Sequence, residues 1–222
     1  NFHAYTLQSK IALTMTAALI LIPGLFFFFF ELDPSTSLSE HFLISFFQSV
    51  TTRTAGYNTI DIKDFSETGR AALIALMLIG GSPGSTAGGI KTTTAFTLFA
   101  IMIATFRLKK DPTCFSRRLS SETQRHAVTI LMMYLLLFAS GSVLLNLIDG
   151  IRLIDSAFET ASALGTVGLS IGVTDDLGPL SKYVMMLLMF FGRIGGLTVI
   201  FAAHAHSRQD SGRSPEERIT IG

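Results

Sequence analysis

The chain has 222 residues, of which 49% are apolar and only 15% are charged. Soluble domains carry about 25% charged residues, so the composition predicts a membrane protein rather than a water-soluble one. A net charge of +1, with no basic stripe interleaved with aromatic residues, argues against nucleic-acid binding. Cys114 is the only cysteine, which excludes an intrachain disulfide and a cysteine-based zinc cage. The chain opens on Asn1 without a signal-peptide pattern, so we expect a truncated or processed start.

Four apolar stretches are predicted to cross the membrane: residues 11–30, 71–106, 126–148 and 183–205. At ~1.5 Å per residue, the first matches the roughly 30 Å hydrocarbon core. The second is too long for one straight span, so we expect its middle to depart from a regular helix.

The charges between these stretches predict their orientation. Residues 107–125 hold six basic and two acidic residues, whereas residues 31–70 and 149–182 are acidic on balance. Cytoplasmic loops are enriched in Lys and Arg. We therefore expect a multi-pass protein of the cell membrane, with the 107–125 linker and the C-terminal tail in the cytoplasm.

Two short apolar segments, residues 42–50 and 154–164, are too brief to span and are candidates for re-entrant helices. One constant shift along the chain superposes Phe46 on Phe158, Gly80 on Gly192, and Thr54-Ala-Gly-Tyr on Thr166-Val-Gly-Leu. Three elements that share one offset indicate a duplication. The predicted fold is an all-α membrane protein with two tandem repeats of outer helix, re-entrant pore helix with filter loop, and inner helix. The repeats occupy residues 1–110 and 126–206, joined by the basic linker 111–125 and followed by the tail 207–222.

The two turns after the re-entrant helices are similar to the Thr-Val-Gly-Tyr part of a potassium channel filter. Such a filter directs consecutive backbone carbonyls at an ion, which demands dihedral angles that a Cβ resists. The alternative is a pair of ordinary loop glycines. The candidate potassium-binding carbonyls belong to Arg53, Thr54, Ala55, Gly56, Gly165, Thr166, Val167 and Gly168.

The long second stretch contains a glycine-rich break with Pro83, which cannot continue a straight helix. The break lies below the first candidate filter turn, where permeant ions would pass. Arg193, at membrane depth in the last span, is a second candidate functional residue. Simpler alternatives are a packing kink with a snorkelling Lys91, and a structural salt bridge from Arg193 to Glu159. Arg53 and Glu159 are expected to buttress the filter.

Three stretches resemble the Trk/Ktr/HKT superfamily of cation transporters: residues 49–58, residues 80–91 and residues 192–196. The ending Pro-Glu-Glu-Arg-Ile-Thr-Ile-Gly222 is similar to the C-terminus of the bacterial Ktr membrane subunit. The resemblance implies a potassium uptake pore of four repeats, of which this chain holds the third and fourth. It implies no cofactor in this chain, K⁺ as the cargo and Na⁺ as a candidate activator. The implied partners are membrane lipid, a second copy of the full-length subunit, and a cytosolic RCK-type nucleotide-binding ring, with no nucleic acid.

The same resemblance implies a movable gate loop at the break, with Arg193 beside it. The candidate gate residues are Gly80, Gly81, Ser82, Pro83, Gly84, Ser85, Thr86, Gly88, Gly89, Lys91 and Arg193.

Two other classes stay open on the residues alone. Gly80-Gly-Ser82-Pro-Gly84 satisfies the nucleophile-elbow pattern, which would make Ser82 the nucleophile of an intramembrane serine hydrolase. The elbow needs a strand-to-helix turn, whereas this segment interrupts a predicted helix, so we expect no enzyme. A non-conducting membrane scaffold is the other alternative.

Overall fold

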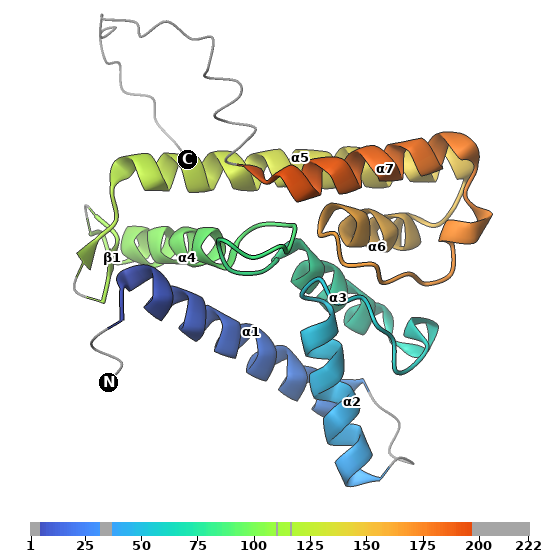
Figure 1. The fold of residues 1–222 in the computed structure, drawn as a ribbon, viewed down its shortest axis with the longest axis horizontal. Helices are drawn as coiled ribbons and strands as arrows, with labels where there is room; N and C mark the ends of the chain where they lie inside the picture. Colours follow the sequence, from blue (N-terminus) through green and yellow to red (C-terminus); the bar gives the residue numbers. More distant parts are fainter. Residues whose placement is uncertain (1–4, 32–36, 110, 116, 197–222) are drawn as a thin grey trace, which may run out of the picture.

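A computed structural model describes residues 5–31, 37–109, 111–115 and 117–196, and these are mostly helical (Figure 1). The α-helices are α1 (Leu7–Phe30), α2 (Leu38–Thr51), α3 (Glu67–Leu78), α4 (Thr92–Phe106), α5 (Ser121–Asp149), α6 (Leu153–Leu164) and α7 (Pro179–Ile194). Two single turns of 3₁₀ helix, η2 (Ile62–Asp64) and η3 (Thr174–Asp176), precede α3 and α7.

One order of elements occurs twice along the described chain. A long helix, a short helix, a loop and a further helix appear as α1, α2 and α3, and again as α5, α6 and α7. The long helices α1 and α5 are long and apolar enough to cross a membrane, and α4 is a shorter apolar helix. Each long helix begins at a hydroxyl cap, where Thr6 and Ser120 accept from the amides of Ser9 and Thr123.

The predicted break in the second apolar stretch is present, because α3 ends at Leu78 and α4 begins at Thr92. The fourth predicted span begins within α7, which ends at Ile194. The rest of that stretch beyond residue 196, and the predicted tail 207–222, lie outside the described residues.

The predicted all-α chain has one departure, a short hairpin in the basic linker. Strands β1 (Thr113–Cys114) and β2 (Arg117–Arg118) pair antiparallel, with Thr113 opposite Arg118 and Cys114 opposite Arg117. Arg118 forms an ion pair with Asp111 beside this hairpin. Two-residue strands are too short to give a periodic signal. Helix α5 begins at Ser121, within the predicted linker 111–125.

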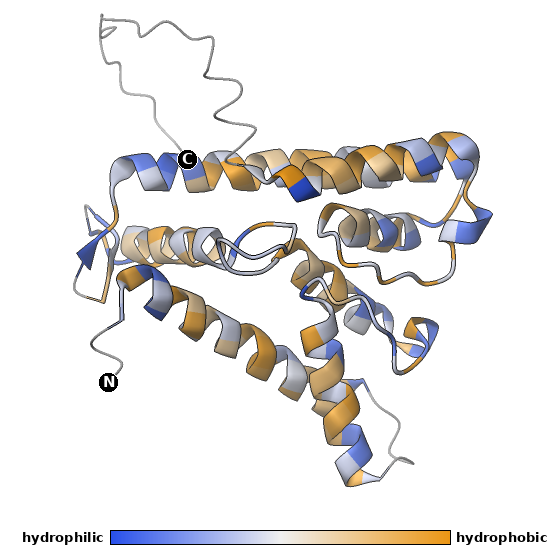
Figure 2. Ribbon diagram, viewed as in Figure 1, coloured by the Kyte–Doolittle hydropathy of each residue, from blue (hydrophilic) through white to orange (hydrophobic). Residues whose placement is uncertain are grey.

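Helix α6 lies at the centre of the packing, in contact with α3, α5 and α7 (Figure 1). Phe158 and Ala161 belong to one buried cluster with residues of α3, and Ala163 and Leu164 belong to a second cluster with residues of α5 and α7. Helix α2 packs mainly against α1. Figure 2 shows apolar residues along most of α1, α4, α5 and α7, as expected of helices whose outer faces meet lipid.

Candidate functional site

Two turns that lie far apart in the sequence meet in the structure. The first follows α2 and the second follows α6. The Thr54 hydroxyl lies 3.4 Å from the carbonyl oxygen of Gly165. A Cβ added to Gly56 would overlap the carbonyl oxygen of Val167. The structure therefore brings both halves of the predicted carbonyl set together at one place.

The two turns have the same unusual backbone. Positive φ angles occur at Thr54 (67°) and Gly56 (75°) in the first turn, and at Thr166 (52°) and Gly168 (96°) in the second. Both pairs are related by the same offset that relates the two repeats in the sequence. Positive φ is uncommon for a β-branched residue and costs about 1–3 kcal/mol, and such strain concentrates at functional sites.

The amide groups of the turns are directed back at the preceding helices. Ala55 and Gly56 donate to the carbonyl of Thr51 (3.1 and 3.2 Å), and Val167 donates to that of Ser162 (2.8 Å). Among the described residues, the carbonyls of Arg53, Thr54, Ala55, Gly56, Thr166, Val167 and Gly168 accept no hydrogen bond, and that of Gly165 accepts only the long one from Thr54. Free carbonyl oxygens gathered in this way form an electronegative surface that suits a cation.

Different side chains hold each turn. The hydroxyl of Thr51 accepts from the amide of Tyr57 (2.9 Å) and donates to its carbonyl (2.7 Å). The carboxylate of Glu159 is 1% exposed and accepts from the hydroxyls of Ser170 and Thr174 (2.7 Å each) and from the amide of Ile171 (3.1 Å). Neither Thr51, Ser170 nor Thr174 was singled out by sequence reasoning, because hydroxyl residues near a turn are common and carry no pattern.

The break between α3 and α4 is a loop closed at its base. Ile79 and Ile90 form a parallel bridge, with hydrogen bonds from the Gly80 amide to the Ile90 carbonyl (2.8 Å) and from the Ile90 amide to the Leu78 carbonyl (2.9 Å). At the next step the Thr92 amide donates to the carbonyl of Gly81 (3.1 Å). The chain between α3 and α4 thus forms a hydrogen-bonded loop and not a simple kink in one helix.

This loop contacts both turns. The Arg53 guanidinium, from the first turn, donates to the carbonyl of Gly80 (3.1 Å). The Gly88 amide donates to the Thr166 hydroxyl of the second turn (3.0 Å). A Cβ on Gly80 would overlap the carbonyl oxygen of Gly88, so these two positions are adjacent across the loop.

Two further cations bind backbone carbonyls at the far side of the loop. Lys91 donates to the carbonyl of Ala87, and Arg193, from the end of α7, donates to that of Thr86. The alternative salt bridge from Arg193 to Glu159 is wrong, because no ion pair between the two is present in the described residues. Glu159 is instead occupied by the loop that follows the second turn. Both residues line one cavity of about 660 Å³ beside that turn.

Ser82 lacks the surroundings of a serine nucleophile. Its hydroxyl lies 3.5 Å from the Thr92 hydroxyl, and its carbonyl accepts from the amide and hydroxyl of Ser85. The segment joins two helices, so the strand-to-helix turn of a nucleophile elbow is missing here.

Residues 6–213 match the family model described as TrkH, cation transport protein. The chain therefore belongs to this family of cation transporters, and it is a membrane protein of a transporter family rather than of an enzyme family.

Named relatives agree with the family. The chain is 38% identical to the potassium/sodium uptake protein NtpJ of Enterococcus hirae over 98% of its length, and 35% identical to the Ktr system potassium uptake protein D of Bacillus subtilis over 99%. It spans about 50% of each of these relatives. The crystal structure of the potassium transporter TrkH from Vibrio parahaemolyticus superposes with a TM-score of 0.69 at 21% identity, covering 88% of this chain and 43% of that one. This structure supports the fold.

Proposed function

We propose that the chain is half of the pore-forming subunit of a potassium uptake protein of the cell membrane. Its relatives are named as potassium or potassium/sodium uptake proteins, and it covers half of their length. In this proposal the two repeats supply two of the four walls of one pore. In this proposal the chain needs no cofactor. K⁺ is the transported ion, and Na⁺ acts as an activator or competitor.

The observation that carries the proposal is the matched geometry of the two turns. Their positive φ angles fall at equivalent positions, and among the described residues their carbonyls accept no hydrogen bond except the long one from Thr54 to Gly165. The carbonyls of Arg53, Thr54, Ala55 and Gly56, and of Gly165, Thr166, Val167 and Gly168, replace part of the hydration shell of K⁺. The backbone, rather than the side chains, carries the selectivity.

The loop between α3 and α4 acts as the gate. Its base is held by backbone hydrogen bonds, whereas its far side is held by Lys91 and Arg193. A loop held at that side by two long cationic side chains can be released without unfolding the helices that flank it. Arg193 also places a positive charge beside the path, which opposes cation passage while the loop is closed.

The partners follow from the family. The full-length subunit pairs with a second copy of itself in the lipid bilayer and sits on a cytosolic nucleotide-binding ring. The basic 107–125 linker and the C-terminal tail lie on the cytoplasmic side and contact that ring. The excess of Lys and Arg in the linker supports this orientation.

The test is a flux assay on the full-length protein with Gly56→Ser or Gly168→Ser. The positive φ strains a Cβ at either position, and at Gly56 the Cβ would also overlap the carbonyl oxygen of Val167. We expect Na⁺ to compete with K⁺ in both variants. The control is Gly150→Ser, which meets the same strain at φ 68° where α5 ends, away from both turns, and should leave selectivity unchanged. An unchanged K⁺ preference in well-folded Gly56→Ser and Gly168→Ser proteins would contradict the proposal.

A further inference from the structure

A cavity of about 160 Å³ lies at the C-terminal end of α4, apart from the two turns and the gate loop. A water molecule needs roughly 10–15 Å³ of such space, so the cavity has room for a group much larger than one water. Its walls come from one face of α4, from the chain just after that helix, and from β1. Six of the lining residues matter here: Phe96, Phe99, Ile103, Arg107, Lys109 and Thr113.

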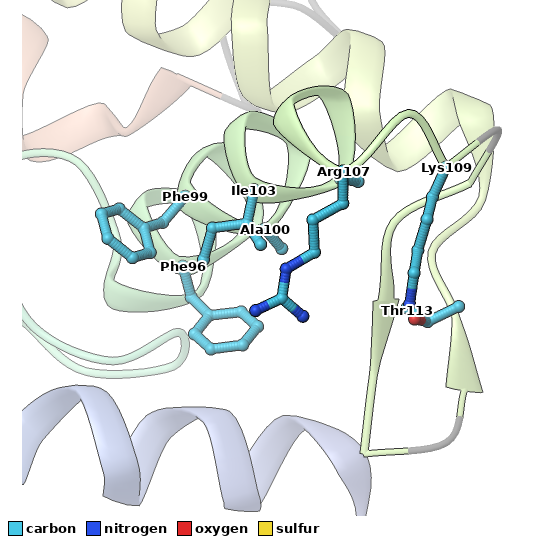
Figure 3. Close-up of a pocket in the computed structure, with 8 residues that line it drawn as sticks. Phe96, Phe99, Ala100, Ile103, Arg107, Lys109 and Thr113 are labelled. Carbon is cyan, nitrogen blue, oxygen red and sulfur yellow. The ribbon is translucent and has the colours of Figure 1, made fainter.

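The end of α4 directs two positive charges at this cavity. Lys109 donates its amide to the carbonyl of Ala104, and Leu108 donates to that of Thr105, with Leu108 at φ 52°. This Schellman-type reversal usually has Gly at the left-handed position. The reversal folds the chain so that Arg107 and Lys109 line the same space. Figure 3 shows both side chains running the same way, with the Phe96 ring beside the Arg107 guanidinium and Thr113 beside the Lys109 ammonium.

Neither cation has a counter-ion among the described residues. In that part of the chain no ion pair or side-chain hydrogen bond involves Arg107 or Lys109. The nearby Asp111 is paired with Arg118, and the described residues that line the cavity include no acid. Two cations converging on one cavity without a carboxylate favour an anionic occupant.

Apolar side chains continue outward from the same place. Phe99 is 58% exposed and Ile103 is 38% exposed, and both stand on the α4 face that lines the cavity. A free phosphate would pair with the two cations but would leave these apolar side chains uncovered. A phospholipid uses both, because its phosphate meets the cations while its acyl chain covers the apolar side chains.

We propose that this cavity is a binding site for an anionic phospholipid. Its phosphate lies between Arg107 and Lys109 near the Thr113 hydroxyl, and an acyl chain lies along Phe99 and Ile103. The inference takes from the proposed function only the placement of this end of α4 at the cytoplasmic face, where anionic lipids are enriched.

The test is native mass spectrometry of the delipidated full-length protein, titrated with phosphatidylglycerol or with phosphatidylcholine of the same chain length. We expect phosphatidylglycerol to bind more tightly. The double variant Arg107→Gln/Lys109→Gln should weaken it about thirtyfold, since each surface cation contributes about a fivefold gain in affinity for anionic lipid. The matched control Arg117→Gln/Arg125→Gln removes two exposed charges, on β2 and on α5, that do not line the cavity, and it should keep the binding.

A second pair of variants tests the cavity without changing charge. Ala100→Trp fills the space between the lining side chains and should abolish the bound phosphatidylglycerol, whereas Ala139→Trp on an exposed face of α5 should not. Equal binding of the two lipids, or equal loss in the charge control, would overturn the proposal. Displacement by inorganic phosphate with no dependence on acyl-chain length would overturn it in favour of a soluble anion. Native mass spectrometry measures lipid binding without any transport. A negative result would therefore contradict the lipid site and leave the proposed pore untouched.

Discussion

The two turns share a backbone conformation but are held by different means. In the first turn, Thr51 clamps the amide and carbonyl of Tyr57 through its hydroxyl. Its equivalent in the second repeat, at the offset that relates the two turns, is Ala163, which has no such group. In the second turn the Ser162 hydroxyl accepts from the amide of Gly168 (3.2 Å), and Glu159, whose equivalent in the first repeat is Phe47, holds the loop that follows. The duplicated chain has kept the geometry of the turn and exchanged the side chains that support it.

The helices below the turns differ in the same way. All residues of α6 from Asp155 to Leu164 are buried except Ala157, which is half-buried. Helix α2 leaves Phe42, Leu43 and Val50 exposed, at 50%, 68% and 44%. A buried carboxylate is tolerated only when its oxygens are well satisfied, so the Glu159 clamp suits the buried helix. The second turn therefore follows a helix that is buried among the other helices, whereas the first turn is held mainly by its own local hydrogen bonds.

The largest expected effect comes from Glu159→Ala. It leaves the buried amide of Ile171 and two half-buried hydroxyls without their acceptor. Hydrogen bonds to a charged group contribute about 1.5–3 kcal/mol each, and we expect a loss of about 3 kcal/mol or more of folding free energy. Thermal unfolding in detergent measures it. The matched variant at the equivalent position, Phe47→Ala, should cost less because Phe47 is 36% exposed. An equal loss of folding free energy in the two variants would contradict the proposed difference in how the two turns are held.

Deletion of Ser82 to Thr86 tests the loop that joins the two turns. The deletion removes the carbonyl that Arg193 binds, and a charge-assisted hydrogen bond of about 1.5–3 kcal/mol corresponds to about a tenfold or larger rise in K⁺ flux. Flux in vesicles that contain the full-length protein measures it.

The control for this deletion keeps the length of the loop. Replacing Ser82, Pro83, Ser85 and Thr86 by Gly preserves the backbone carbonyl that Arg193 uses, so flux should stay low. Unchanged or lower flux in a well-folded deletion protein would contradict the gate.

Thr51→Ala should have a smaller effect, confined to the first turn. The Tyr57 amide and carbonyl lose their partner, at a cost of about 1 kcal/mol for ordinary neutral hydrogen bonds. We expect a small drop in thermal stability with weakened K⁺ preference, and Thr51→Ser should restore both because it keeps the hydroxyl. A Thr51→Ser variant as weak as Thr51→Ala would show that the methyl group, and not the clamp, matters.

The smallest effect is expected at Cys114, outside both turns. Burial raises the pKa of the Cys114 thiol, so the folded protein favours the protonated form. The stabilising contribution is present below the ordinary thiol pKa and is lost as the pH rises through the raised one. The wild type should therefore lose stability relative to Cys114→Ala only at alkaline pH, and iodoacetamide should label Cys114 slowly at neutral pH. Rapid labelling at neutral pH would show that the thiol is not held in the hairpin.

Sequence reasoning predicted well where a local pattern specifies the structure. Apolar stretches place α1 and α5, and the glycines with Pro83 place the end of α3 and the start of α4. It failed on the hairpin, because the two-residue strands at Cys114 carry no period. It also left the partner of Arg193 open, since whether Thr86 or Glu159 lies beside it depends on how α7 packs.

The support of each turn was the hardest part to predict. Glu159 was expected to buttress the filter, but its three partners lie 11 to 15 residues further along the chain and were not identifiable. The exchange of Thr51 for Ala163 is likewise invisible to a repeat search, which seeks identical residues and not equivalent contacts.

The central claim is that the carbonyls of the two turns bind the transported cation. Crystals of the full-length protein soaked in Tl⁺, a K⁺ substitute with strong anomalous scattering, test it most directly. We expect anomalous peaks within coordination distance of the backbone oxygens of Thr54 to Gly56 and of Thr166 to Gly168, and we expect them to be lost or displaced in Gly168→Ser. Peaks held only by side-chain carboxylates elsewhere, with none beside these oxygens, would contradict it.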